Sequence, residues 1–161
     1  MLDIRVATEK DFPPIWEIFQ PVIAAADTYA YAPDTTRAQA QRIWMEAPAT
    51  PHVAEEEGRI LGTYVLRPNQ PGLGDHVANC AYMTHPAARG RGIADAMCVH
   101  SLQAALERGY RAMQFNFVVA SNVHAIALWQ KHGFAIVGRV PGAFRHRTFG
   151  DTDVLVMHRM L

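Results

Sequence analysis

The spacing of hydrophobic positions changes along the chain between the two-residue period of strands and the three-to-four-residue period of helices. Glycine, proline or a polar cluster separates most of these segments. The predicted strands are 3–7, 52–56, 60–67, 77–84, 112–119, 134–140 and 153–160. The predicted helices are 8–23, 36–45 (starting at Thr35 or Thr36), 91–108 and 121–132. The order β-α-α-β-β-β-α-β-α-β-β predicts a single α/β domain over residues 1–161, with a mixed central sheet that is parallel where helices connect strands.

Composition narrows the class of protein. The 161 residues are 50% hydrophobic and 19% charged, and their 15 basic and 15 acidic side chains cancel. Such a balance provides no basic surface for nucleic acid, and no apolar run reaches the roughly 20 residues of a membrane helix. The first residues, MLDIRVATEKDF, lack the apolar stretch of a secretion signal, so we expect a cytoplasmic protein. Cys80 and Cys98 fit buried, reduced thiols, and the eight histidines show no metal-site spacing.

Residues 89–94, RGRGIA, stand between a predicted strand and a predicted helix. A helix N-terminus presents free N–H groups and the positive end of the helix dipole, which together attract phosphate. Gly90 and Gly92 would let the backbone approach an anion closely, and Arg89 and Arg91 would add charge-assisted contacts. The segment therefore indicates a cradle for a phosphate or pyrophosphate, although an ordinary strand-to-helix turn with exposed arginines would have the same sequence.

Two well-known phosphate motifs do not fit this segment. A P-loop continues with Gly-Lys-Ser/Thr, whereas Gly92 is followed by Ile93 and Ala94. A dinucleotide fingerprint requires a third glycine at the position of Asp95, whose charge would repel a pyrophosphate. Neither a P-loop protein nor a Rossmann protein is therefore indicated.

A second motif lies in the next predicted helix, where residues 121–134 read SNVHAIALWQKHGF. Together the two segments resemble the GCN5-related N-acetyltransferase family over nearly the whole chain. The family's R/Q-x-x-G-x-G/A cofactor loop is matched at Arg89, Gly92 and Ala94. Its N-x-x-A-x-x-L-Y-x-x-x-G-F segment is matched at Asn122, Ala125, Leu128, Gly133 and Phe134.

The resemblance implies that acetyl-CoA is the ligand of the glycine turn. Its pyrophosphate would be bound by the backbone amides of Gly90, Arg91, Gly92, Ile93, Ala94 and Asp95. Its pantetheine arm would pair with the exposed edge of strand 77–84, at Tyr82, Met83 and Thr84. Asn122 matches the family's asparagine that contacts this arm, but asparagine is also a frequent helix N-cap, so either role fits it.

Two positions depart from the family pattern. Many relatives have a tyrosine that protonates the departing thiolate and a glutamate that acts as base, where this chain has Trp129 and Phe117. Neither side chain can exchange a proton near neutral pH. Trp129 would pack or donate a hydrogen bond. A water chain towards His85, Asp75 or His76 could serve as the proton route, but each of these is also typical of a loop, so no catalytic residue is assigned.

Asn79 and Asn116 interrupt predicted strands that are otherwise apolar. A buried asparagine needs hydrogen-bond partners, which a bulge, a loop or a ligand could supply. The segments around both residues resemble the branch of the family that acetylates proline analogues such as azetidine-2-carboxylate, in which matching asparagines hold the substrate's carboxylate. Tyr29 lies in the matching Asp-Thr-Tyr of the loop 25–36. The resemblance therefore implies a small-molecule amine, an amino or imino acid bound by these three residues.

Two other functions fit the same motifs. A protein N-terminal acetyltransferase would require an open groove, whereas the aromatic-rich loop 25–36 is better suited to closing a small pocket. A sensor that binds acyl-CoA without turnover is favoured by the two replaced catalytic residues. The family often forms homodimers, which the sequence neither requires nor excludes, and no metal is expected.

Overall fold

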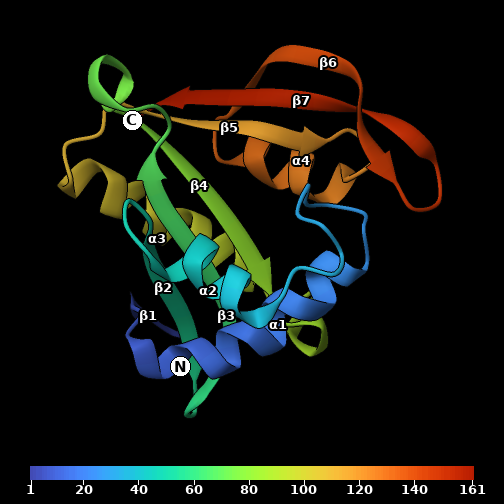
Figure 1. Ribbon diagram of the computed structural model, residues 1–161. Coiled ribbons are helices and arrows are strands. Elements are labelled where there is room, and N and C mark those ends of the chain that lie inside the picture. Colours follow the sequence, from blue (N-terminus) through green and yellow to red (C-terminus); the bar gives the residue numbers. More distant parts are fainter.

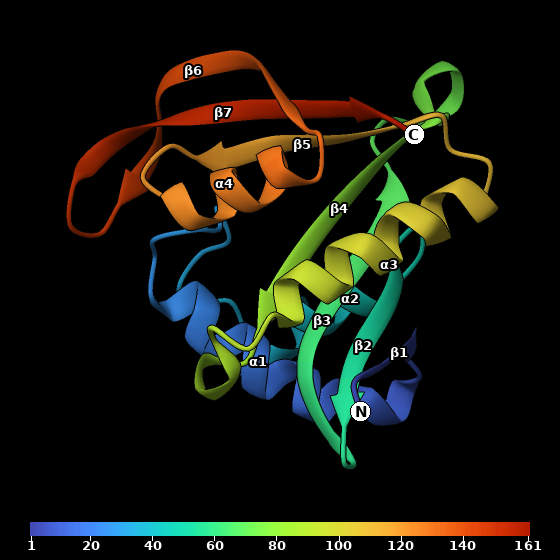
Figure 2. The same ribbon diagram turned by 180° about the vertical axis from the view of Figure 1, so that it is seen from behind.

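A computed structural model describes all 161 residues and contains one seven-stranded sheet with helices on both faces (Figures 1 and 2). The strand order is β1-β2-β3-β4-β5-β7-β6. The strands are β1 (Asp3–Val6), β2 (Thr50–Glu56), β3 (Arg59–Pro68), β4 (Val77–Thr84), β5 (Ala112–Val119), β6 (Ala135–His146) and β7 (Gly150–Met160). The helices are α1 (Phe12–Ala24), α2 (Arg37–Met45), α3 (Ile93–Glu107) and α4 (Val123–Lys131), with 3-10 helices at Glu9–Asp11, Gly72–Gly74 and Pro86–Ala88. The predicted element order and mixed α/β architecture are confirmed.

Several elements differ from their predicted boundaries: α1 begins at Phe12 rather than Thr8, after a 3-10 helix, and β7 begins at Gly150 rather than Asp153. α3 begins at Ile93, later than predicted, because Gly92 has φ = +76° and a left-handed residue cannot belong to a right-handed helix. β6 extends to His146, beyond its predicted end at Val140, since it continues to pair with β7 past an irregularity between Val140 and Phe144. None of the helices combines the length and apolarity needed to cross a lipid bilayer.

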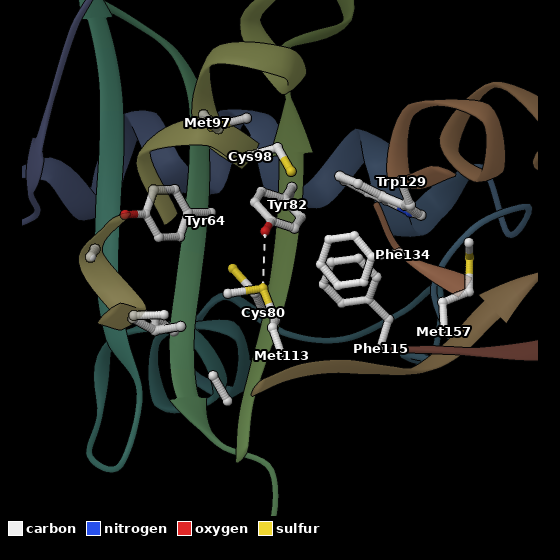
Figure 3. Close-up of a cluster of buried hydrophobic side chains, with 14 of the residues drawn as sticks. Tyr64, Cys80, Tyr82, Met97, Cys98, Met113, Phe115, Trp129, Phe134 and Met157 are labelled. Atoms are coloured by element: carbon white, nitrogen blue, oxygen red, sulfur yellow. Dashed lines mark hydrogen bonds between the residues drawn. The ribbon is translucent and has the colours of Figure 1, made fainter. Parts of the chain in front are cut away.

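Two hydrophobic clusters fill the two faces of the sheet. The cluster beneath α1 and α2 contains Phe12, Ile15, Ile18, Phe19, Val22, Ile23, Ala40, Trp44, Val53, Val65 and Met83. The cluster beneath α3 and α4 contains a group of neighbouring aromatic rings, Tyr82, Phe115, Trp129 and Phe134 (Figure 3). Cys80 and Cys98 are free and buried in this second cluster, which confirms the prediction that both thiols are buried.

β4 and β5 lie side by side but pair at only two positions. The parallel ladder joins Val77 to Ala112 and Ala78 to Met113 and ends there. Beyond these residues the two strands diverge, as both views of the ribbon show (Figures 1 and 2). We call this divergence of β4 and β5 the fork. Because alternate residues of a strand direct their backbone groups to the same edge, the rest of β4 directs N–H and C=O groups towards the fork, where no neighbouring strand pairs with them.

Candidate functional site

The turn between β4 and α3 leaves a series of backbone N–H groups free. Gly90 and Gly92 both have φ = +76°, a conformation that side chains other than glycine rarely adopt. None of the backbone N–H groups from Gly90 to Asp95 donates a hydrogen bond within the protein, and no side chain caps α3. A Cβ built on either glycine would meet no atom within 4 Å. An open array of N–H groups at a helix N-terminus fits a pyrophosphate.

The charged side chains around this turn are unevenly paired. Arg91 forms an ion pair with Glu56 at the end of β2, whereas Arg89 has no ion-pair partner. The Oδ1 atom of Asp95 accepts hydrogen bonds from Lys131 Nζ at 2.7 Å and His132 Nε2 at 2.8 Å. These contacts lower the pKa of Asp95, and the hydrogen bond from Lys131 makes the largest contribution. The carboxylate in the first turn of α3 is therefore bound to the end of α4, and its charge is partly compensated there.

Tyr82 directs its backbone groups into the fork. Its N–H donates to the hydroxyl of Tyr29 at 2.9 Å, and that hydroxyl donates to the Tyr82 carbonyl at 2.5 Å. Thr84, two residues on, shares this orientation, whereas Met83 pairs with Thr63 of β3 and is buried beneath α1 and α2. Of the three residues predicted for the cofactor edge, Tyr82 and Thr84 therefore present backbone groups to the fork and Met83 does not.

Tyr29, predicted as a substrate residue, lies in the loop between α1 and α2. Its ring stacks on that of Tyr31, with centroids 6.0 Å apart and an interplanar angle of 11°. Burial raises the pKa of Tyr29, and the positive charge of Arg67 acts in the opposite direction. The hydroxyl therefore stays protonated at neutral pH and can both donate and accept at the edge of β4.

Asn79 and Asn116 both lie where β4 and β5 separate, but they do not bond to each other. Asn79 Nδ2 donates to the backbone carbonyl of Gln114 at 3.0 Å. Asn116 Nδ2 donates to Asn69 Oδ1 at 2.6 Å, and its Oδ1 accepts from Gln114 Nε2 at 2.9 Å. The amide of Asn79 thus connects the two strands just beyond their last pair, while Asn116 binds the loop that follows β3.

Trp129 and Phe117, at the positions of the missing acid and base, have different surroundings. Trp129 is buried, and its ring centroid lies 4.9 Å from those of both Tyr82 and Phe115 (Figure 3). Phe117 is 41% exposed and meets the ring of Phe144 edge-on at 6.2 Å. The structure therefore gives Trp129 a packing role and places Phe117 at the surface.

The other polar candidates already have structural roles or lie away from the fork. Asn122 is the N-cap of α4, and its Oδ1 accepts the N–H of the third helical residue at 3.3 Å. His85 Nδ1 accepts a backbone hydrogen bond at 3.1 Å from within the 3-10 helix Pro86–Ala88. Asp75 and His76 are exposed residues just before β4, at the end opposite Tyr82. No group of three or more His, Cys, Asp or Glu side chains is arranged to hold a metal ion.

Arg67, near the end of β3, was not selected from the sequence. It is the direct ladder partner of Asn79. Its Nε is buried without a hydrogen-bond partner, and no ion pair includes its guanidinium. The available signal was a lone arginine at the end of an apolar strand, which is also typical of a strand that leaves the core. Only the strand pairing places Arg67 beside the fork.

A family model matches most of this architecture. The model described as the acetyltransferase (GNAT) family matches residues 13–134, which include the glycine turn, the fork and α4. The chain belongs to this family. The part of a GNAT protein that this match covers therefore contains both motifs recognised in the sequence.

Individual relatives agree with this GNAT assignment. The chain is 42% identical to a GCN5-related N-acetyltransferase from Kribbella flavida, with a TM-score of 0.95 and coverage of 99% of this chain and 98% of that one. It is 29% identical over 102 residues to the N-acetyltransferase aca1 of Schizosaccharomyces pombe, a match that covers 62% of this chain but only 49% of that longer protein. A phosphinothricin acetyltransferase from Sinorhizobium meliloti, solved in complex with acetyl-CoA, has the same fold, with 21% identity, a TM-score of 0.86 and coverage of 99% and 88%.

Proposed function

We propose that the protein is an acetyl-CoA-dependent N-acetyltransferase that acts on the amine of a small amino or imino acid. The observation that supports it most is the fork of this GNAT chain together with the free N–H groups of Gly90 to Asp95. The edge of β4 that lacks a partner strand leads towards this turn, so one elongated ligand with a pyrophosphate can use both. Acetyl-CoA has this shape and chemistry.

The residues of this path fit acetyl-CoA in detail. The N–H groups of Gly90 to Asp95 would bind its pyrophosphate, with Arg89 as an unpaired cation beside them. The backbone groups of Tyr82 and Thr84 would hydrogen-bond the amides of its arm. Asn122 caps α4 through Oδ1 only, which leaves its Nδ2 able to donate to the same arm. Bound acetyl-CoA supplies an acetyl group activated as a thioester.

Direct transfer to the amine is favoured over a cysteine intermediate. Burial raises the pKa of both Cys80 and Cys98 to about 12, so neither thiol forms the nucleophilic thiolate at neutral pH. Phe117 and Trp129 provide no proton exchange, so the amine loses its proton to water. The chain's own contribution is to bind and orient the two substrates and to exclude solvent.

A small substrate is favoured over a protein N-terminus because two segments beside the fork are joined to each other. The loop after α1 and the β6–β7 hairpin, distant in sequence, are joined by a hydrogen bond from Arg147 N to the Ala26 carbonyl at 3.1 Å. In Figure 1 this loop rises beside α4 towards the hairpin. A peptide substrate would need an open groove, which a connection between these two segments disfavours.

The test is thiol release from acetyl-CoA with a panel of amines. We expect azetidine-2-carboxylate and proline analogues to have higher kcat/KM than polyamines or peptides with a free N-terminus. Preference for the peptides would support an N-terminal acetyltransferase instead. Tight acetyl-CoA binding without thiol release for any amine would support a sensor. This second candidate is favoured because neither Phe117 nor Trp129 can exchange a proton near neutral pH.

A further inference from the structure

Arg67 points to the face of the sheet that α1 and α2 cover. Val65, two positions earlier in β3, is buried beneath α1 and α2, and side chains two apart in a strand share a face. Asn79 lies directly opposite Arg67 in β4. Asn79 in turn bonds to Gln114 of β5, so Arg67, Asn79 and the start of the fork form one continuous group.

The guanidinium of Arg67 lacks the partners that a half-buried cation normally has. Its Nε is shielded from solvent and makes no hydrogen bond, and its guanidinium takes part in no ion pair. A buried donor without an acceptor costs free energy. The charge is also close enough to Tyr29 to act on the pKa of its hydroxyl, which places it near the α1–α2 loop. An anion bound at this point would satisfy the guanidinium.

The two asparagines are less available than Arg67. Each already uses an amide N–H within the protein, Asn79 to Gln114 and Asn116 to Asn69. What remains on each is one neutral N–H. A guanidinium has five N–H donors in a planar arrangement that matches both oxygens of a carboxylate, and its charge strengthens each bond.

We therefore propose that Arg67 binds the carboxylate of the substrate and selects anionic amino or imino acids, while Asn79 and Asn116 position the fork around it. The role of Arg67 rests on the function proposed above, because the carboxylate is useful only where the amine is acetylated. It assigns the main carboxylate contact to a residue of β3 rather than to the two asparagines.

The experiment compares two substrates in three variants. Azetidine-2-carboxylate and its neutral carboxamide differ in the group that Arg67 would bind, and kcat/KM is expressed per neutral amine because the carboxamide also lowers the amine pKa. In Arg67→Met, which keeps the aliphatic stem, we expect kcat/KM for the carboxylate to fall about 10- to 150-fold and for the carboxamide to change by less than about threefold. Arg67→Lys keeps the charge but not the planar donors, so its kcat/KM for the carboxylate should lie between those of the native protein and Arg67→Met. The matched control is Arg59→Met, at the exposed start of the same strand, which should leave both values unchanged.

The native protein and the variants test different statements. If the native protein does not prefer the carboxylate to the carboxamide, the proposed substrate class is wrong. If it does and Arg67→Met keeps that preference, the role of Arg67 is wrong while the function stands. Removing an unpaired charge should leave the melting temperature equal or higher. Loss of folding, or an equal loss for both substrates, would show that Arg67 is structural and would overturn the proposal.

Discussion

At the scale of single residues, the conformation of Gly92 decides whether the turn before α3 can hold an anion. Its φ of +76° strains any side chain, and a Cβ there would project into open space at the start of α3. We expect Gly92→Val to weaken acetyl-CoA binding at least tenfold, or about 1.4 kcal/mol, by calorimetry. Gly58→Val in the β2–β3 turn is the matched control, because Gly58 has the same φ of +76° and equally open surroundings. Equal cofactor affinity in both variants would contradict the cradle.

The hydroxyl of Tyr29 bonds to the same N–H and C=O of Tyr82 that a cofactor arm would use. Removing it in Tyr29→Phe should therefore tighten acetyl-CoA binding by about 2- to 10-fold, the value of one hydrogen bond of about 0.5–1.5 kcal/mol. Tyr31→Phe, in the ring stacked on Tyr29, should leave the dissociation constant unchanged. Weaker binding in Tyr29→Phe would mean that the hydroxyl supports the cofactor instead of competing with it.

At the scale of elements, Asp11 fastens the start of α1 to β1. Its carboxylate accepts two hydrogen bonds from Arg5, at 2.8 and 2.9 Å, and one from the N–H of Thr8 at 2.7 Å. The pKa of Asp11 is lowered to about 2, and the hydrogen bond from Arg5 makes the largest contribution. An acid whose pKa is depressed on folding stabilises the protein above its unfolded pKa, and this stabilisation is lost as the pH falls through the folded pKa.

Asp11→Asn should consequently lower the free energy of unfolding at pH 7 by about 1–2 kcal/mol, after allowance for solvent screening. The difference should shrink as the pH falls from about 4 to about 2, where the native carboxylate becomes protonated. Urea unfolding at several pH values measures this. Asp34→Asn, at an exposed position of the α1–α2 loop, is the control. A difference that does not depend on pH would rule out the ion pair as its source.

Element boundaries were predictable where local chemistry sets them. The choice between Thr35 and Thr36 is decided by Gln39, whose N–H bonds to Thr36 Oγ1 at 3.3 Å. The second half of β6 was missed because proline, glycine and charged residues interrupt its pattern, and only pairing with β7 keeps it extended. The partners of Asn79 and the buried, unpartnered Nε of Arg67 depend on which strands become neighbours. A periodicity within one strand contains no information about that.

At the scale of the whole molecule, the site is built from segments of both halves of the sheet. It contains no side-chain acid or base with a pKa near neutral pH at the positions of Trp129 and Phe117. An alkyl ammonium with a pKa near 10 is only about 0.1% neutral at pH 7. We therefore expect kcat/KM to rise with pH, by up to about tenfold per unit, until the amine's own pKa is reached. Steady-state rates between pH 6 and 10 measure this. A plateau near pH 6–7 would reveal a side-chain base, and a substrate amine of lower pKa serves as the control, because its curve should level off earlier.

The shortness of the β4–β5 ladder divides the sheet into two parts, which we call plates. One plate is β1 to β4 and the other is β5, β7 and β6, and their edges meet at only two rungs, Val77–Ala112 and Ala78–Met113, reinforced by the amide of Asn79. A ladder of ordinary length would hold such plates rigid over the whole strand. Here a ligand lying along the free edge of β4 would take the place of the missing rungs. Binding of the ligand would then also stabilise the contact between the two plates, because the ligand would act as an additional strand.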